Sequence, residues 1–310
     1  MSHAFDVRRL PAHPPFALRA HHSGLVTASI RKILFPSDLS HSSDRALDHA
    51  QLLAERFDAR LTLYHVVEAP VVRGPLTWNP AREAGRRAEA AAREHLDHRA
   101  ARLHVPHAVV VYQRPSAHHA LVRYIAATRP DLTVMATHGR DGLAHLVLGS
   151  VTESVLNGTH RPVLCVRAPD HGVALSYRRV LVPTDLSTMS RRVFPLAAHI
   201  ARAFDAEVVA VHVSPPPTVA SLVGVPDVVE KATVEESEVW EFLQPDFGGL
   251  RATVRVPGGA PAEAIVETAR VEKADVIVMS THGRDSFADR VRGSHTERVV
   301  RHAPCPVLAM

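Results

Sequence analysis

Two long stretches of this chain carry the same motifs in the same order, and this repetition limits the possible fold more than any other feature. KILFPSDLS (residues 32–40) recurs as RVLVPTDLS (residues 179–187), 147 residues later. ATHGRDGLAHLVLGSV (residues 136–151) recurs as STHGRDSFADRVRGSH, 144 residues later. A chain of 310 residues has room for two domains of ordinary size. We therefore expect a duplicated protein with domains over 30–168 and 178–310, joined by a linker over 169–177.

Within each copy, short apolar runs alternate with longer helical patterns. The first run, ILF or VLV, ends at Pro-Ser/Thr-Asp, and Ser40 or Ser187 then stands where a helix N-cap belongs. β-Branched strands that alternate with helices predict a parallel sheet covered by helices on both faces. The fold class is thus α/β, with two tandem doubly wound, Rossmann-like domains of five parallel strands each. Ligands of such sheets bind beyond the carboxyl ends of the strands, where the motifs of this chain lie.

Composition and charge argue against several classes of function. The net charge of +4 comes from scattered arginines without a basic stripe or interleaved aromatics, so we expect no nucleic-acid interface. No apolar stretch reaches the roughly 18 residues that span a membrane, so we expect no membrane partner. Residues 1–29 contain prolines but no uninterrupted apolar segment, and we interpret them as a disordered lead-in rather than a signal peptide.

Cysteine and histidine usage predicts neither disulfides nor a metal site. The two cysteines, Cys165 and Cys305, lie in short apolar runs without a CxxC partner, so we expect them to be small buried strand residues. This usage is typical of a reducing compartment and favours a cytoplasmic location. The 22 histidines are scattered without the spacing of metal ligands on one face.

The repeated phrase has the chemistry of an anion site. His138-Gly139 is followed after nine residues by Gly149-Ser150 at the start of a predicted helix, and the second copy keeps this spacing. A glycine after a strand permits a positive φ and a close ligand approach, and a helix start offers free N–H groups and a positive dipole end. Asp38 and Asp185 would face the same crevice, where a carboxylate can accept a hydrogen bond from the amino group of a base. The alternative is that the phrase forms only an ordinary turn and N-cap. Because the phrase occurs twice with the same spacing, a binding site is favoured.

Four motifs together resemble the universal stress protein family. They are PSDLS and PTDLS after the first strand, HV after the second, MATHGR and MSTHGR after the fourth, and GSVTE and GSHTE at the last helix. The resemblance covers nearly all of residues 30–310 and implies two UspA-type domains with the adenine nucleotide alpha hydrolase-like fold. The nucleotide-binding branch of the family resembles the pattern G-x-x-G-x9-G-S/T and binds ATP. The resemblance therefore implies ATP, with Mg²⁺, in one or both halves.

The resemblance also implies which residues bind the nucleotide. In the first half they are Pro36, Ser37, Asp38, Val66, Met135, Gly139, Arg140, Gly149, Ser150 and Val151. In the second half they are Pro183, Thr184, Asp185, Val213, Met279, Gly283, Arg284, Gly293 and Ser294. The aspartates would contact adenine, Val66 and Val213 would bond adenine through their backbone, and the methionines would line the pocket. The glycines with Ser150 and Ser294 would hold phosphates, and Pro36-Ser37 and Pro183-Thr184 would border the ribose. The first glycine of the family pattern is replaced by Ala136 in one half and Ser280 in the other.

Three functions stay open at this point. The first is an ATP-binding module that acts in stress responses through unknown protein partners; the second is a nucleotide-free interaction protein; the third is a slow ATPase. We expect no enzyme, because His138 and His282 have no adjacent nucleophile or acid. The resemblance further implies that the two halves pair through their last strands, near residues 162–167 and 306–310, and it leaves a homodimer of chains open.

Overall fold

The structure is a computed structural model that describes residues 29–69, 80–137, 148–167, 175–214, 234–281 and 295–310. Nearly all of the expected lead-in over 1–29 lies outside the described residues. The first half contains β1 (Lys32–Pro36), α1 (Ser42–Phe57), β2 (Arg60–Glu68), α2 (Pro80–Ala100), β3 (His107–Arg114), α3 (Ala117–Thr128), β4 (Leu132–Ala136), α4 (Ser150–Gly158) and β5 (Val163–Val166). The second half contains β6 (Arg179–Pro183), α5 (Thr188–Arg191), α6 (Phe194–Phe204), β7 (Glu207–Val211), α9 (Glu236–Phe247), β8 (Ala252–Arg255), α10 (Pro261–Val271), β9 (Val276–Met279), α11 (His295–His302) and β10 (Val307–Ala309).

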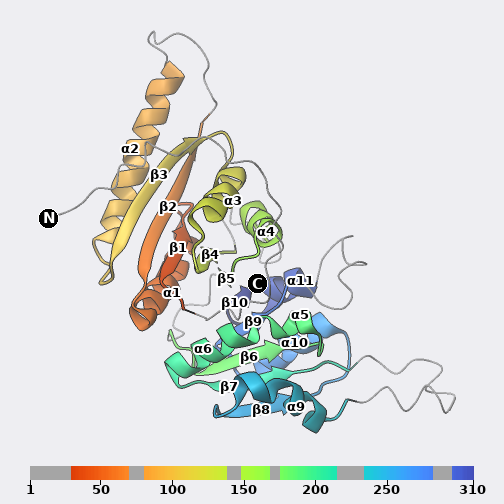
Figure 1. Cartoon of the computed structure of the whole chain (residues 1–310). Coiled ribbons are helices and arrows are strands. Elements are labelled where there is room, and N and C mark those ends of the chain that lie inside the picture. Colours follow the sequence, from red (N-terminus) through yellow and green to blue (C-terminus); the bar gives the residue numbers. More distant parts are fainter. Residues whose placement is uncertain (1–28, 70–79, 138–147, 168–174, 215–233, 282–294) are drawn as a thin grey trace, which may run out of the picture.

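The described strands form a single ten-stranded sheet with the order β3-β2-β1-β4-β5-β10-β9-β6-β7-β8. All pairs within a half are parallel, which confirms the doubly wound fold expected for each copy. The halves meet edge to edge where β5 and β10 pair antiparallel, with Leu164 opposite Leu308. The predicted pairing through the last strands is thus confirmed, and it joins the two five-stranded sheets into one (Figure 1).

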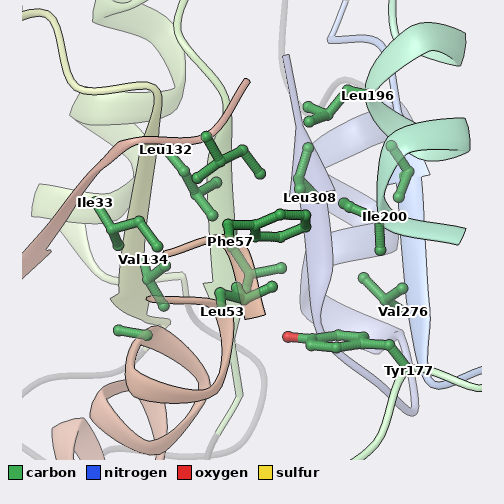
Figure 2. Packing of buried hydrophobic residues seen from close by; sticks show 14 of the residues in the cluster. Ile33, Leu53, Phe57, Leu132, Val134, Tyr177, Leu196, Ile200, Val276 and Leu308 are labelled. Atoms are coloured by element: carbon green, nitrogen blue, oxygen red, sulfur yellow. The ribbon is translucent and has the colours of Figure 1, made fainter. Parts of the chain in front are cut away.

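Helices cover both faces of this sheet because successive strand residues point to opposite faces. In β1, Ile33 and Phe35 belong to the core under α1, α2, α6 and α9, whereas Leu34 belongs to the core under α3, α4, α10 and α11. The first of these cores runs across both halves (Figure 2), where the ring of Phe57 points toward Leu308. The halves therefore share one apolar seam in addition to the β5–β10 pairing.

The duplication extends to unusual backbone conformations. Among the described residues, six non-glycine residues have a positive φ, and they form three pairs at equivalent positions: Leu39 and Leu186, Asp58 and Asp205, and Arg129 and Lys273. Asp58, Arg129 and Asp205 are left-handed caps directly after a helix, and Lys273 lies two residues after α10. Leu39 and Leu186 lie in the turn after the first strand of each half. The repeat thus preserves the backbone conformation at these three positions.

The two expected N-caps have different outcomes. Ser187 is the N-cap of α5, and its hydroxyl accepts a hydrogen bond from the N–H of Ser190 at 3.1 Å, as predicted. The prediction for Ser40 was wrong, since α1 begins at Ser42 after His41 and the Ser40 hydroxyl donates to Asp38 at 2.6 Å instead. Because α1 begins two residues later, the Ser40 side chain belongs to the turn after β1, where its hydroxyl makes a charge-assisted hydrogen bond with the carboxylate.

One helix differs between the copies because of a proline. In the first half α1 is continuous, whereas the equivalent stretch is divided into α5 and α6. Pro195 lies in the first turn of α6. Proline has no N–H and its ring clashes with the carbonyl four residues earlier, so a helix that reaches it restarts there.

Both cysteines are free thiols; Cys165 is buried in β5, and Cys305, just before β10, is only partly buried. Within the described part of the chain, no helix has the length and apolar character needed to cross a membrane.

Candidate functional site

A cavity of about 1040 Å³ opens at the carboxyl edge of the sheet in the first half. Its floor is the end of β1, β2 and β4, and its walls come from α2 on one side and from α3 and α4 on the other. The N-terminal turns of α2 extend past the ends of β2 and β3 (Figure 1). Its middle turns line the cavity through Ala88, Ala91, Ala92 and His95. This is the edge where open parallel sheets bind ligands.

The turn after β1 places a carboxylate in this cavity. Asp38 lines it, and one of its carboxylate oxygens accepts hydrogen bonds from the N–H of Ser40 at 3.0 Å and from the Ser40 hydroxyl at 2.6 Å. The next residue, Leu39, has a φ of 67°, which is unfavourable for a residue with a Cβ. Its N–H donates to the Ser37 hydroxyl at 3.1 Å. Such a conformation persists only where surrounding bonds enforce it.

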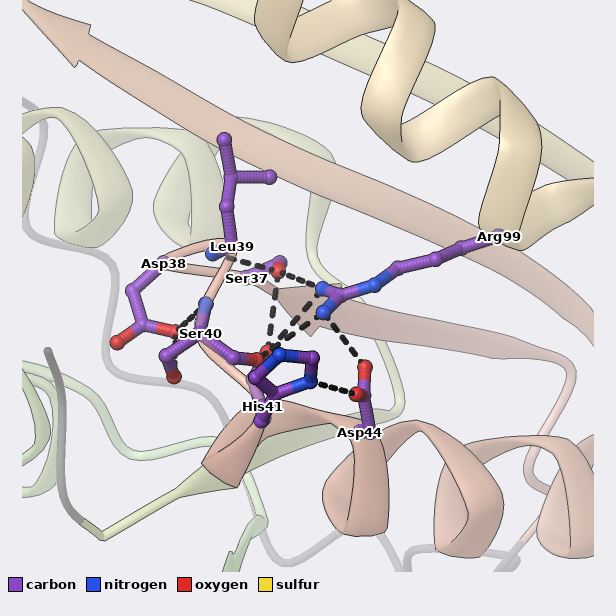
Figure 3. A network of polar contacts seen from close by, with 8 residues as sticks. Ser37, Asp38, Leu39, Ser40, His41, Asp44 and Arg99 are labelled. Carbon is purple, nitrogen blue, oxygen red and sulfur yellow. Dashed lines mark hydrogen bonds and ion pairs between the residues drawn. The ribbon is translucent and has the colours of Figure 1, made fainter.

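Arg99 of α2 supplies further bonds to this turn. Its guanidinium donates to the hydroxyls of Ser37 and Ser43 at 3.2 and 3.3 Å and to the Ser40 carbonyl at 3.1 Å. It also forms an ion pair with Asp44 at 2.6 Å, and its side chain is only 11% exposed. Figure 3 shows the guanidinium on one side of the turn and the Asp38 carboxylate on the other.

His65 joins the ends of β1 and β2. Its Nδ1 atom lies 2.8 Å from the Ser37 carbonyl oxygen, and because a carbonyl only accepts, Nδ1 carries the proton. His212 repeats this contact with the Thr184 carbonyl at 2.9 Å. The Tyr64 carbonyl accepts from the N–H of Ser37 on the β1 side. Val66 lies two residues after Tyr64 in β2, so its backbone N–H and C=O point to the same side of the strand, toward β1. Because β1 ends at Pro36, these groups of Val66 face the cavity.

The other end of the cavity is the start of α4. The N–H of Gly149 donates to the Thr137 carbonyl at 2.9 Å, and the Thr152 hydroxyl donates to the Ala136 carbonyl at 3.0 Å. A Cβ at Gly149 would lie 3.2 Å from the Thr137 carbonyl oxygen, so this close approach favours glycine. Ser150 then opens the nine-residue helix, whose first N–H groups and dipole favour an anion.

Ionisable groups in the described lining are few. Asp38 and Glu68 supply carboxylates, and no Lys or Arg appears among the described residues that line the cavity. Burial, and then the nearby Arg99, lowers the pKa of His95, which favours a neutral imidazole in the wall. Burial, with Tyr124 as the next cause, raises the pKa of Tyr64 to about 12, so this phenol stays protonated.

The structure brings eight of the predicted first-half residues together around this cavity: Pro36, Ser37, Asp38, Val66, Met135, Gly149, Ser150 and Val151. In the second half, Pro183 ends β6, Thr184 and Asp185 follow it, Met279 ends β9, and Val213 comes shortly after β7. The remaining predicted residues, Gly139, Arg140, Gly283, Arg284, Gly293 and Ser294, lie outside the described residues, as do His138 and His282.

Ala136 and Ser280, which replace the first glycine of the family pattern, are both described. Neither residue has a positive φ. The added side chains therefore cause no left-handed backbone strain at these two positions.

Sequence reasoning missed three groups that shape the site. They are Arg99, which holds the turn from a distant helix; the ring of His65, of which only the following valine was expected to act; and Thr152, whose hydroxyl ties α4 to β4. A signal existed for the last two, because His212 and Thr296 make the same kind of contact in the second half. Arg99 has no such counterpart, since the equivalent residue is Asp246.

Comparison with known proteins agrees with this geometry. The family model described as the universal stress protein family matches residues 29–167 and again 176–310. A universal stress protein of Mycolicibacterium smegmatis is 26% identical over 289 residues, which cover 90% of this chain and 96% of that protein. A universal stress protein of Methanocaldococcus jannaschii is 35% identical over 144 residues, covering 43% of this chain and 82% of that protein.

A solved structure of a universal stress protein from Archaeoglobus fulgidus shares the fold with a TM-score of 0.60. It is 21% identical and covers 89% of this chain and 97% of that chain. Both halves thus carry the same domain, and the chain belongs to the universal stress protein family as a tandem protein.

Proposed function

We propose that the first half of this protein binds an adenine nucleotide, with ATP as the ligand, and that the protein is a regulatory binding module in stress responses. The observation that carries this proposal is the cavity of about 1040 Å³, which collects eight residues from four separate segments at the carboxyl edge of the sheet. A pocket of this size, mostly apolar with a few converging polar groups, is typical of small-molecule sites.

The two ends of the cavity suit the two ends of ATP. At the β1–β2 end, Asp38 can accept from the adenine amino group, the backbone of Val66 can pair with the base edge, and Met135 offers an apolar surface. At the other end, Gly149 and Ser150 present the start of α4 to the phosphates. The polarity of the cavity thus matches a ligand with a base at one end and an anion at the other.

The described residues do not fit a protein-built metal site. They contain no group of three His, Cys, Asp or Glu side chains that could hold a metal ion. Mg²⁺ commonly binds proteins through substrate phosphates and water. We therefore propose that any Mg²⁺ enters with ATP and takes its ligands from the phosphates and water.

We propose that the second half is the weaker site. Thr184, Asp185 and Met279 repeat the first half, but the wall helix differs, because α9 has Phe242 at the position equivalent to His95 of α2. The Phe242 ring packs edge-on against Phe194, with 5.8 Å between the ring centroids. A bulky ring in place of an imidazole leaves less room along that wall.

We also propose binding without efficient turnover. Hydrolysis of ATP needs a group that positions or deprotonates the attacking water. His65 lies at the end of the cavity where β1 and β2 end, and His95 lies on the wall formed by α2, so neither imidazole belongs to the start of α4, where the phosphates would bind. The two free thiols support a reducing, cytoplasmic setting.

The deciding experiment is to denature freshly purified protein and measure the released adenine nucleotide per chain, followed by calorimetry with added ATP and Mg²⁺. Wild type should carry or bind about one nucleotide per chain with high affinity. Asp38→Ala should weaken binding by about tenfold, since a hydrogen bond to a charged group is lost, whereas Asp185→Ala should leave the stronger site unchanged.

Two results would decide against this proposal. Absence of both released nucleotide and added ATP binding would leave a nucleotide-free interaction protein. Steady phosphate release that Asp38→Ala removes would instead indicate an ATPase.

A further inference from the structure

The same ion pair occurs in both halves with its charges exchanged. In the first half, Asp44 of α1 pairs with Arg99 of α2 at 2.6 Å. At positions 147 residues later, Arg191 of α5 pairs with Asp246 of α9 at 2.9 Å. The two helices that carry Arg99 and Asp246 also end at equivalent positions, α2 at Ala100 and α9 at Phe247. The duplication therefore preserved the ion pair and reversed which helix carries the cation.

This exchange changes what the cation can reach. Arg99 extends from α2 to the turn after β1, where it donates to the hydroxyls of Ser37 and Ser43 and to the carbonyl of Ser40. In the second half the Nε atom of Arg191 bonds to Asp246, and its guanidinium carbon lies 5.6 Å from the centre of the Phe242 ring.

The hydroxyl groups of the second turn have different partners. In the part of the chain that the structure describes, no guanidinium donates to Thr184, Ser187 or Ser190. The Thr184 and Ser190 hydroxyls bond to each other at 2.9 Å, and the Ser187 hydroxyl accepts from the N–H of Ser190. In the first half the Ser40 hydroxyl donates to Asp38 instead. Within the described residues, a guanidinium of the neighbouring helix therefore bonds to Ser37, Ser40 and Ser43 of the first half and not to the equivalent Thr184, Ser187 and Ser190.

A short chain of hydrogen bonds connects Arg99 to the cavity. Arg99 holds the Ser40 carbonyl, and the N–H and hydroxyl of Ser40 both bond to one carboxylate oxygen of Asp38. Leu39, between them, is held in a left-handed conformation with a φ of 67°. Arg99 itself does not line the cavity. Its effect on a ligand must therefore pass through the position of the turn.

We propose that Arg99 is a positioning residue that fixes the direction of the Asp38 carboxylate and so makes the first half selective for adenine over guanine nucleotides. Adenine presents an amino donor at the position where guanine presents a carbonyl acceptor. A carboxylate with a fixed direction accepts a hydrogen bond from the amino group of adenine and repels the carbonyl oxygen of guanine. A mobile carboxylate discriminates less between the two bases. This inference rests on the proposed nucleotide site and adds the residue that sets its base preference.

The test measures the affinities of the full chain for ATP and GTP by calorimetry, together with the thermal midpoint. Wild type should prefer ATP. Arg99→Lys keeps a charge near Asp44 but cannot supply the planar fork that reaches both hydroxyls and the carbonyl. It should stay folded, lose about tenfold in ATP affinity and retain its GTP affinity, so that the ATP-to-GTP ratio falls.

The second half provides a matched variant. The double variant Asp44→Arg with Arg99→Asp copies the arrangement of Arg191 and Asp246, and it restores an ion pair without restoring the bonds to the turn. It should recover the thermal midpoint relative to Arg99→Asp alone while the ATP-to-GTP ratio stays low. Asp246→Ala removes the equivalent ion pair from the second half and should leave the ratio at its wild-type value.

Several outcomes would overturn the proposal. A wild-type ratio in Arg99→Lys would show that the turn does not need the guanidinium. A ratio restored by the charge-exchanged double variant would show that the ion pair alone matters. Wild type that binds neither nucleotide would reject the proposed function itself, a result that is visible before any variant is made.

Discussion

The Nδ1 atom of His49 lies 2.8 Å from the hydroxyl oxygen of Tyr177, 128 residues further along the chain. The contact joins α1 of the first half to the segment that precedes β6, and both residues are buried. The Tyr177 ring packs edge-on against Phe204, with 5.0 Å between the centroids. Tyr177 belongs to the apolar seam between the halves (Figure 2), where an unpaired polar group would be costly.

His49 should make the stability of the protein depend on pH. Burial, and then the nearby Arg45, lowers the pKa of His49 from 6.5 to about 3. Between these pH values the unfolded chain binds a proton that the folded chain does not, so stability is full above pH 6.5 and falls as the pH decreases. From pH 7.5 to 5, wild type should lose about 2 kcal/mol more unfolding free energy than His49→Gln.

Urea denaturation at the two pH values measures this difference. Burial also lowers the pKa of His199, but this residue is present in both proteins, so its contribution cancels in the comparison. Equal losses in wild type and His49→Gln would show that His49 is not kept neutral by the fold.

Phe57 should couple the unfolding of the two halves. Its ring stacks on His199 of α6, with 4.8 Å between the centroids, and meets the edge of Phe204. Truncation to alanine leaves a cavity in the seam and should cost about 3 kcal/mol. In calorimetry we expect the transition of Phe57→Ala to shift down and to separate into two steps. Val271→Ala, at a side chain that is 69% exposed, should change the free energy of unfolding by less than about 0.5 kcal/mol.

An unshifted, single transition in Phe57→Ala would instead mean that the β5–β10 pairing alone holds the halves together.

The sequence predicted the features of the fold that depend on local periodicity and on the repeat. Alternation of β-branched runs with helices predicted two doubly wound halves, and the motifs at strand ends predicted the sheet edge where the cavity lies. These predictions held because strand and helix periods are local properties of the chain. The offset of 147 residues also pairs Leu39 with Leu186, whose left-handed backbone conformations recur in the structure.

Contacts between distant segments could not be predicted in this way. Arg99 is 62 residues from Ser37 in the sequence, and nothing local distinguishes it from Arg93 or Arg102 in the same region. Ser40 was expected to cap a helix, but α1 begins two residues later and the Ser40 hydroxyl donates to Asp38 within the turn, a side-chain contact that a propensity does not include. Side-chain partners of this kind depend on the tertiary arrangement.

Gly149 should be intolerant of a side chain. A Cβ there would lie 3.2 Å from the Thr137 carbonyl oxygen, which is backbone and cannot rotate away. Gly149→Ala should therefore displace the start of α4, lower stability by about 1 kcal/mol and weaken ATP binding. Gly258→Ala is the matched control, because nothing lies within 4 Å of a Cβ at that position. Thermal unfolding and calorimetry of both variants test this; equal behaviour of the two would contradict the close approach.

Thr152 and Thr296 should separate stability from binding. Each hydroxyl donates to a backbone carbonyl at the end of the fourth strand of its half, Thr152 to Ala136 at 3.0 Å and Thr296 to Ser280 at 3.3 Å. Valine keeps the shape but removes the donor, so a hydrogen bond to a partly buried carbonyl is lost and each variant should lose about 1 kcal/mol of stability. Thr152 also lines the cavity, and the loss frees the start of α4 beside Ser150. Only Thr152→Val should therefore lower the affinity for ATP. Thr152 supports the site of the first half, and Thr296 supports the equivalent position of the second half. Equal losses of ATP affinity in Thr152→Val and Thr296→Val would therefore mean that both halves bind the nucleotide alike.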